Sequence, residues 1–261
     1  MVSPQRKGNI MEEMTVEDMT RALEQTSTAI LVCGGTEQHG YHLPLSTDYI
    51  SAYEIAKEAS RMTGCLLLPP LCYSYSGGKL PGTTDISPDT TTRVITDIGL
   101  SLAEQGIRNI VLFVGHCGSE HLAAVKEAGY RIMEQAPRTH VAYAPILALS
   151  KTWLEYLGGG GEHAGKGETS LMLYVRPDLV RDERPYDTEE TRKPKPSPFI
   201  IENFILEERP KGIPKREAPY KYGVNNASAL EATTEFGKVL FNEIVKTLAE
   251  IVQSMERISR M

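Results

Sequence analysis

Side chains that can bind a metal ion or move a proton gather in three short segments of this chain. The sequence holds six histidines, of which only His140 begins a predicted strand. The other five fall just past a predicted strand end or in a glycine-rich loop, and they are His39, His42, His116, His121 and His163. Because ligands bind beyond the carboxyl ends of the strands of a parallel sheet, histidines and acids gathered there indicate a metal site, acid–base chemistry or both.

The first segment, Gly35–His42, is followed by Asp48. Its Glu-x-His spacing places Glu37 and His39 on one side of an extended chain, because alternate residues share a face. Together with Asp48 they form a nitrogen and oxygen ligand set that suits Zn²⁺ or Mn²⁺. The alternative is a hydrogen-bonded polar loop in which Asp48 only caps the helix that begins at Tyr49.

The second segment, Gly115–His121, follows the clearest predicted strand. Its glycines let the backbone approach a ligand closely, and the free N–H groups of the next helix can bind an anion. His116 is a candidate metal ligand here, whereas Cys117 and Ser119 are candidate nucleophiles. No G-x-S-x-G pattern surrounds Ser119, which weakens its case as a nucleophile. A helix cap explains Ser119 equally well. For Cys117 a packed thiol is the favoured interpretation.

The third segment, Gly158–Ser170, combines a glycine run with His163 and Glu168. We interpret it as a mobile loop that carries both side chains over a site, with a short helix beginning near Glu168; a surface loop with a capped helix is the alternative. Gly160–Lys166 matches the start of a phosphate-binding loop, but Gly167 stands where that loop needs a serine or threonine, so nucleotide binding is not expected. Three such segments, which a parallel sheet would align, indicate one shared site.

Four apolar runs predict the strands that position these segments. The runs alternate with helical patterns, which is typical of βαβ units and of a mostly parallel sheet covered on both faces. The expected strands are Ala29–Cys33, Cys65–Leu68, Asn109–Val114 and His140–Ala144. The expected helices between them span 49–61, 88–105 and 120–135, whereas 153–157 makes a doubtful strand.

The last third of the chain differs in composition. Residues 182–222 are rich in proline and charge, and we expect a long ordered arm or a subunit contact there rather than a separate domain. From 228 to 258 apolar residues recur at helical spacing and predict a closing amphipathic helix. These residues are Phe236, Val239, Leu240, Ile244, Leu248 and Ile251. Residues 1–261 are therefore expected to form one domain.

Composition excludes several classes of protein. Of the 261 residues, 41% are hydrophobic and 24% are charged, as in ordinary globular proteins. The 28 Lys and Arg residues against 34 Asp and Glu residues give a net charge of −6, so binding to nucleic acid or to an anionic membrane is not expected. The four scattered cysteines suit a reducing compartment. No apolar stretch has the length of a membrane span or of a signal-peptide core, and we expect a cytoplasmic protein.

The three segments resemble the signatures of the creatininase (creatinine amidohydrolase) family. Gly35–Asp48 resembles the first signature of that family, Gly115–Ser119 its N-G-H-G-G-N signature, and His163–Ser170 its H-A-G-x-x-E-T-S signature. Gly77–Thr83 resembles the family's loop ahead of its F/L-P-G-T element. The motifs occur in the family's order, and the resemblance fades to general architecture after about Pro177.

The resemblance implies a three-layer α/β/α sandwich with a mostly parallel sheet, a homo-oligomer that is often a hexamer, and two divalent metal ions per chain, Zn²⁺ and/or Mn²⁺. By motif, Glu37 and His116 would hold one ion, and His39 would hold the other. Asp48 would bridge the two ions, and Glu168 would complete the second site.

The same resemblance places His163 beside the substrate as a proton-transfer or orienting group and makes Glu168 the second candidate catalytic residue. The chain also departs from the family, because creatininase supplies a metal ligand two residues after the signature histidine, where this chain has Gly118. That difference argues against creatinine as the substrate. It also moves the ligand role to Glu168, with Glu120 as the weaker candidate.

The expected activity is that of a divalent-metal-dependent hydrolase, in which a metal-bridged hydroxide attacks the carbonyl of an amide or cyclic amide in a small polar substrate. Family relatives also include hydrolases that cleave a C–C bond of an inositol-derived cyclic diketone, and that reaction is the alternative. A non-catalytic oligomer that binds a metal or another ligand is the alternative from a different class. Speculative pocket residues are Tyr73, Tyr75, Lys79 and Trp153.

Overall fold

Five parallel strands form the centre of the protein in a computed structural model, which describes residues 8–191, 220–224 and 227–259. Their order across the sheet is β1-β3-β2-β4-β5, and every pairing is parallel. The strands are β1 (Asn9–Ile10), β2 (Thr28–Cys33), β3 (Leu66–Leu67), β4 (Asn109–Val114) and β5 (His140–Pro145). The predicted α/β class with a mostly parallel sheet is confirmed.

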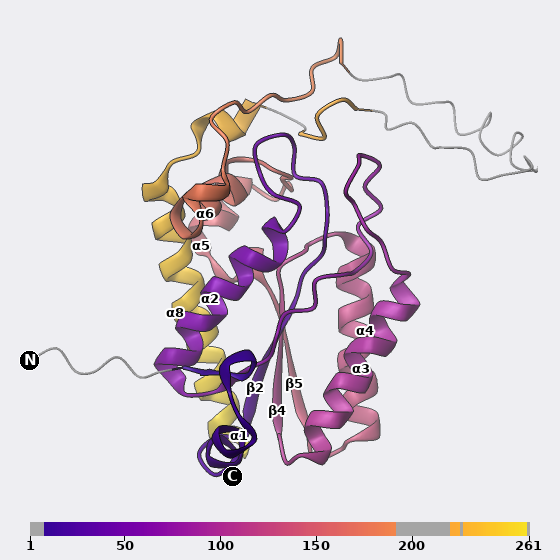
Figure 1. The fold of residues 1–261 in the computed structure, drawn as a ribbon, viewed down its shortest axis with the longest axis vertical. Helices are drawn as coiled ribbons and strands as arrows, with labels where there is room; N and C mark the ends of the chain where they lie inside the picture. The colour runs from indigo at the N-terminus through magenta and orange to yellow at the C-terminus, as the bar shows by residue number, and fades with distance from the viewer. Residues whose placement is uncertain (1–7, 192–219, 225–226, 260–261) are drawn as a thin grey trace, which may run out of the picture.

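Helices cover both faces of this sheet. Figure 1 shows α2 and α8 on one side of the strands and α3 and α4 on the other. The helices are α1 (Val16–Leu23), α2 (Thr47–Thr63), α3 (Pro88–Glu104), α4 (Ser119–Gln135), α5 (Lys151–Leu157), α6 (Lys166–Val175) and α8 (Thr234–Ser259). Short 3₁₀ helices are η1 (Met11–Glu13), η2 (Ile146–Leu149), η3 (Pro177–Leu179) and η4 (Ala227–Glu231). The architecture is therefore an α/β sandwich.

Alternation along the central strands explains the two helical layers. Ile30 and Val32 of β2 pack into the core that α2 and α8 cover, whereas Ala29 and Leu31 pack into the core beneath α3 and α4. All six residues of β2 are buried, which is why apolar residues follow one another without a break from Ala29 to Cys33.

Two glycines let helix α2 begin directly against the strand ends. Gly34 follows β2 and Gly115 follows β4, and the last paired residues of these neighbouring strands are Cys33 and Val114. A Cβ atom on Gly34 would lie 2.6 Å from the Cβ of Tyr49, and one on Gly115 would overlap the carbonyl oxygen of Asp48. The absence of side chains at both positions therefore brings the first turn of α2 to the carboxyl edge of the sheet.

Most of the predicted elements are confirmed, with their ends shifted by one or two residues. The structure adds β1 and α1, and it forms helix α5 where the sequence offered a doubtful strand. The closing helix begins at Thr234 rather than at 228, because Ala227–Glu231 forms a 3₁₀ helix. Of the apolar residues that predicted this helix, Leu240 and Ile244 are buried, but Val239 is 44% exposed.

Part of the predicted arm at 182–222, namely residues 192–219, lies outside the described residues. The described residues on either side of that stretch meet, because the Asp187 N–H donates a hydrogen bond to the Val224 carbonyl oxygen at 2.8 Å. Within the described ranges, none of the helices combines the length and apolar character that a bilayer span requires.

The contact between α6 and α8 generates a stability prediction. A Cβ atom on Gly237 of α8 would overlap the carbonyl oxygen of Ser170 in α6. We expect Gly237→Ala to push the helices apart and to lower the free energy of unfolding by about 1–3 kcal/mol in urea titrations. Gly161→Ala is the control, because a Cβ atom there meets nothing within 4 Å. Equal stability of the two variants would contradict this close packing.

Candidate metal centre

Five predicted site residues converge at the carboxyl edge of the sheet. Glu37 and His39 lie in the loop after β2, His116 follows β4, Asp48 lies in the first turn of α2, and Glu168 lies in the first turn of α6. They form two overlapping groups whose ligand atoms lie within 4.8 Å of one another. The convergence that the sequence predicted is therefore present.

The first group joins Glu37, Asp48 and His116. Nδ1 of His116 lies 3.1 Å from Oε2 of Glu37 and 3.1 Å from Oδ2 of Asp48. All three residues are buried. Two carboxylate oxygens and one imidazole nitrogen thus face a common point, and this donor set suits a borderline divalent ion.

The second group joins His39, Asp48 and Glu168. Nε2 of His39 lies 3.0 Å from Oδ1 of Asp48 and 3.8 Å from Oε2 of Glu168. Each oxygen of the Asp48 carboxylate therefore faces a different histidine. The helix cap position before α2 is occupied by Ser46, so Asp48 does not serve as the cap.

Buried atoms without a hydrogen-bond partner test whether metal ions fit these groups. They include Oε2 of Glu37, Nε2 of His39 and Oδ2 of Asp48, and each belongs to one of the two groups. Leaving such atoms buried and unsatisfied is costly, and a bound cation removes that cost. The other ring nitrogen of His39, Nδ1, lies 3.0 Å from the Glu37 carbonyl oxygen, which orients Nε2 toward the group. The donor atoms therefore fit divalent ions.

Mutual charge dominates the electrostatics of the metal-free centre. Burial alone would lower the pKa of His39, but the nearby charge of Asp48 raises it to about 10. Burial would also lower the pKa of His116, but the carboxylates of Asp48 and Glu37 outweigh this effect and raise it to about 11. Conversely, burial would raise the pKa of Asp48, yet the two histidines hold it well below its usual range. Each imidazole and the carboxylate that it faces therefore favour opposite charges.

His163, the predicted proton-transfer residue, lies beside the same cluster. Its ring centroid is 4.5 Å from that of His39. Its Nε2 lies 2.7 Å from the backbone carbonyl oxygen of Gln38, and 3.0 Å from the side-chain nitrogen of Gln38. The carbonyl oxygen accepts only from a protonated Nε2, whereas the amide nitrogen donates only to an unprotonated one, and in either tautomer both contacts hold the ring in one orientation.

A cavity of about 240 Å³ opens beside the cluster, lined by acidic, histidine and small residues together with Ile146, Leu147 and Trp153. Trp153 was among the speculative pocket residues, and it lines the cavity. Tyr73, Tyr75 and Lys79 do not, although Ser76 from the same loop does.

Sequence reasoning missed Glu162, which also lines this cavity. Its carboxylate accepts hydrogen bonds from Nε1 of Trp153 at 2.6 Å and from the backbone N–H of Gly167 at 3.0 Å. Burial, and then the charge of Glu168, raise the pKa of Glu162 to about 7. Its place next to His163 in the chain was a usable signal, but only its contacts with Trp153 and Gly167 distinguish Glu162 from a solvated loop carboxylate.

The remaining sequence candidates lie outside the two groups. Burial raises the pKa of the Cys117 thiol to about 12, which makes it a poor nucleophile, although it lines the cavity. The Ser119 hydroxyl donates to the exposed carboxylate of Glu120 at 2.6 Å, and Glu120 joins none of the candidate groups among the described residues. The Lys166 ammonium lies over the rings of Tyr156 and Phe236, so this side chain is part of helix packing.

The two other histidines of the clusters have neutral, structural partners. Nε2 of His42 lies 2.9 Å from the Thr169 hydroxyl, and Nε2 of His121 lies 3.4 Å from the Cys33 carbonyl oxygen. Burial lowers the pKa of each ring to about 4. Both therefore pack as uncharged imidazoles.

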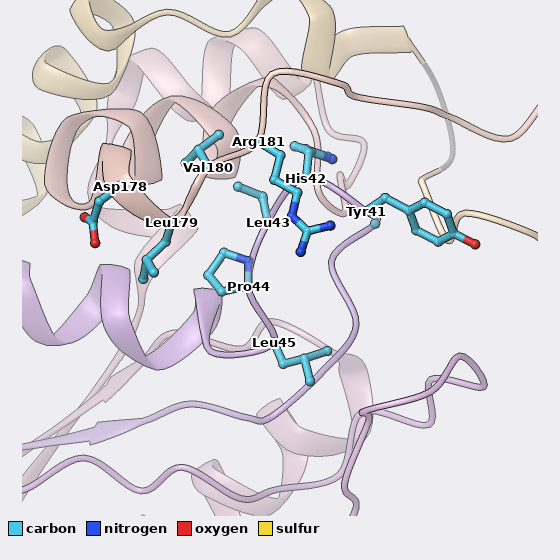
Figure 2. A pocket seen from close by; sticks show the side chains of 10 residues that line it. Tyr41, His42, Leu43, Pro44, Leu45, Asp178, Leu179, Val180 and Arg181 are labelled. Carbon is cyan, nitrogen blue, oxygen red and sulfur yellow. The ribbon is translucent and has the colours of Figure 1, made fainter.

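A larger pocket of about 670 Å³ is lined by residues 40–45 and 178–181, and Figure 2 shows this lining, with Leu43 and Pro44 facing Val180 and Leu179. None of the five clustered residues lines it. Its charged side chains are Asp178 and Arg181, both exposed. The chemistry-bearing residues therefore collect in the smaller cavity.

A parallel α/β sandwich with paired histidine and carboxylate groups at its carboxyl edge is typical of metal-dependent hydrolases. A sequence model of the family Creatininase: Creatinine amidohydrolase matches residues 12–252. The chain therefore belongs to the creatininase family of hydrolases.

Several characterised relatives align with the chain. It is 31% identical over 176 residues to creatinine amidohydrolase of Pseudomonas putida, covering 60% of this chain and 68% of that one. It is 26% identical over 208 residues to 3-dehydro-scyllo-inosose hydrolase of Thermotoga maritima, covering 76% and 64%. It is 30% identical over 175 residues to the mycofactocin precursor peptide peptidase of Mycobacterium tuberculosis, covering 62% and 64%. The chain thus spans about two thirds of the length of these relatives.

Solved structures confirm the fold. A crystal structure of creatinine amidohydrolase superposes with a TM-score of 0.75 at 23% identity, covering 96% of this chain and 98% of that one. A creatininase structure described as the Mn form gives a TM-score of 0.75 at 24% identity, covering 96% and 99%. At this identity the match establishes the shared architecture.

The raised histidine pKa values predict how pH changes the stability of the chelator-treated protein. A group whose folded pKa lies above its unfolded value of about 6.5 stabilises fully below that value and loses its effect as pH rises through the folded pKa. His39 and His116, with folded pKa values of about 10 and about 11, therefore make stability fall from pH 6.5 upward, by at most about 1.4 kcal/mol per pH unit each.

Urea unfolding between pH 6.5 and about 9 measures this slope. His116→Asn should reduce it, and metal-saturated protein should lack it, because ligating imidazoles are already unprotonated. A chelated protein whose stability rises over this range would contradict the charge pairing.

Proposed function

We propose that the clustered residues hold two divalent metal ions, with Glu37 and His116 at one position, His39 and Glu168 at the other, and Asp48 between them. The observation that carries this proposal is the Asp48 carboxylate, whose two oxygens lie 3.0 Å and 3.1 Å from nitrogens of two different histidines. Glu168, rather than the exposed Glu120, completes the second position.

Zn²⁺ and Mn²⁺ are the proposed ions. Solved creatininase structures described as the Mn form and as the Zn-Zn type support this choice, and so does the mixed nitrogen and oxygen donor set. Bound at these positions, two such ions would lower the pKa of water and polarise a substrate carbonyl.

The chain's own residues supply positioning and proton transfer. His163 is the group that takes up or delivers a proton, and its ring is held in place by the Gln38 carbonyl oxygen, 2.7 Å from Nε2. Glu168 contributes a carboxylate at the cavity wall, 3.8 Å from His39. Trp153 and Leu147 give the cavity wall apolar surface.

The proposed reaction is hydrolysis of an amide or cyclic amide C–N bond in a small polar substrate. The creatinine amidohydrolase relative and a cavity of about 240 Å³ support it. Hydrolysis of a C–C bond in a cyclic diketone is the second candidate, because the inosose hydrolase aligns with 76% of this chain. The cavity beside the cluster favours both reactions over a non-catalytic metal-binding oligomer.

We further propose that the chain forms one domain that assembles as a homo-oligomer, such as a hexamer, in the cytoplasm. The family match over residues 12–252 supports the domain, and the family resemblance supports the assembly. The free thiols of all four cysteines suit a reducing compartment.

The metal assignment predicts distinct metal contents. Elemental analysis of the purified wild-type protein should give about two divalent ions per chain. Asp48→Ala should lose both, whereas Glu168→Ala should weaken mainly one, because only Asp48 faces both histidines. Glu120→Ala is the control and should keep the wild-type content. Full metal content in a folded Asp48→Ala protein would refute the bridging role.

The reaction class predicts the outcome of a hydrolysis screen. The panel contains lactams, formamides and cyclic 1,3-diketones, and Asp48→Ala protein serves as the blank. Metal-loaded enzyme should hydrolyse compounds of the amide class. Cleavage confined to the diketones would establish the second candidate instead. A protein that binds two ions and hydrolyses none of the three classes would count against an enzyme of this type.

A further inference from the structure

Residues 220–224, far from the metal centre in sequence, pack against the loop that carries Glu37 and His39. The Tyr222 ring meets the Tyr41 ring edge to face, with centroids 5.1 Å apart. A Cβ atom on Gly223 would overlap the side-chain amide of Gln38. A Cβ atom on Gly40 would lie 2.5 Å from a methyl group of Val224. Both glycines have positive φ, +75° and +68°, so a larger residue would also be strained there. This contact is therefore closely fitted on both sides.

A single buried carboxylate holds this segment in place. Asp187 is 3% exposed, and it accepts hydrogen bonds from four consecutive backbone N–H groups. The donors are Lys221 at 2.8 Å, Tyr222 at 3.1 Å, Gly223 at 2.7 Å and Val224 at 3.3 Å. Burial would raise the pKa of Asp187, but these N–H groups lower it, so the carboxylate stays charged and bound. Hydrogen bonds to a charged acceptor are the strong ones, which makes Asp187 the fixed point of the segment.

The segment reaches His163 through Gln38. The amide of Gln38 lies between Gly223 on one side and His163 on the other, with its nitrogen 3.0 Å from Nε2 of His163. The backbone carbonyl oxygen of Gln38 lies 2.7 Å from the same Nε2 of His163. Displacement of residues 221–224 would therefore free Gln38 and, with it, the His163 ring.

We propose that Asp187 is a positioning residue for His163, acting through Gly223 and Gln38 to hold the imidazole in one orientation and one tautomer. This inference rests on the proposed function for its effect on catalysis. Its physical content, the orientation and tautomer of one ring, is independent of any substrate. Misplacement of a catalytic group by about 1 Å can cost on the order of 100-fold in rate, so a remote anchor of this kind has a measurable effect.

The experiment compares wild type with Asp187→Asn and Gly223→Ala, each loaded with Zn²⁺, which is diamagnetic. Asp187→Asn keeps the shape but points an NH₂ group at backbone donors, and Gly223→Ala presses on Gln38 from the other end. NMR of the ¹⁵N-labelled His163 ring in alkaline buffer should show a single tautomer in wild type and a mixture in both variants. With the substrate class found in the screen, kcat should fall about tenfold or more while KM stays within about twofold. Metal content should remain that of wild type.

Asp18→Asn is the control, because Asp18 also accepts a backbone N–H, that of Thr15 at 3.0 Å, but lies in α1. It should leave the His163 signal and kcat unchanged. If Asp187→Asn and Gly223→Ala lower only the melting temperature, or if either loses metal, the positioning role is wrong. Should Asp187→Asn fail to fold, Gly223→Ala decides alone. A wild type without hydrolase activity would overturn the proposed function, whereas the tautomer measurement would still decide this inference.

Discussion

The burial of one carboxylate between two imidazoles is the constraint on which the rest of the site depends. Asp48 is 3% exposed, and a charge in that position is unfavourable unless it is paired. Its partners, His39 and His116, come from the loops after two different strands. The arrangement therefore requires both loops and the first turn of α2 to meet at one point, and Gly34 and Gly115 provide the space for that meeting.

The order of the strands supplies the rest of the geometry. β2 and β4 are direct neighbours, although α2, β3 and α3 separate them in the chain, and their pairing runs to the last residue of each. The loops that follow them must then lie side by side. Glu168 arrives by another route, through helix α6, which packs against α8 and α2. The centre is thus assembled from two strand ends and two helix beginnings, a common arrangement in parallel α/β proteins.

Outside the clustered ligands, several contacts restrain the groups that would act on a substrate. His39 is oriented by the Glu37 carbonyl oxygen and His163 by the Gln38 carbonyl oxygen, so backbone atoms of the same loop direct both rings. Glu162 ties the glycine-rich segment to Trp153 and to the start of α6. Gly118 lines the same cavity, and a Cβ atom there would lie 2.6 Å from Nε2 of His116, so this position leaves room for that ring.

Local patterns were sufficient for the strands, the main helices and the three polar segments. Apolar runs that end at glycine mark β2 and β4, and the charged and histidine residues after them were recognisable as a set. The short β1 and helix α1 were missed, because a two-residue strand such as Asn9–Ile10 exists only through its pairing with Leu66–Leu67. The run at Trp153 became a helix because Ser150 caps it and its indole is buried.

The sequence by itself determined which residue types lie at the strand ends, since hydrophobic periodicity and glycine placement are local properties of the chain. Only the tertiary structure decided how they meet: which oxygen of Asp48 faces which histidine, that Glu168 rather than Glu120 reaches His39, that Glu162 lines the cavity and that Asp187 is buried. Burial and long-range contact depend on how distant segments pack. For a carboxylate they decide whether it is solvated at the surface or held in place as part of a site.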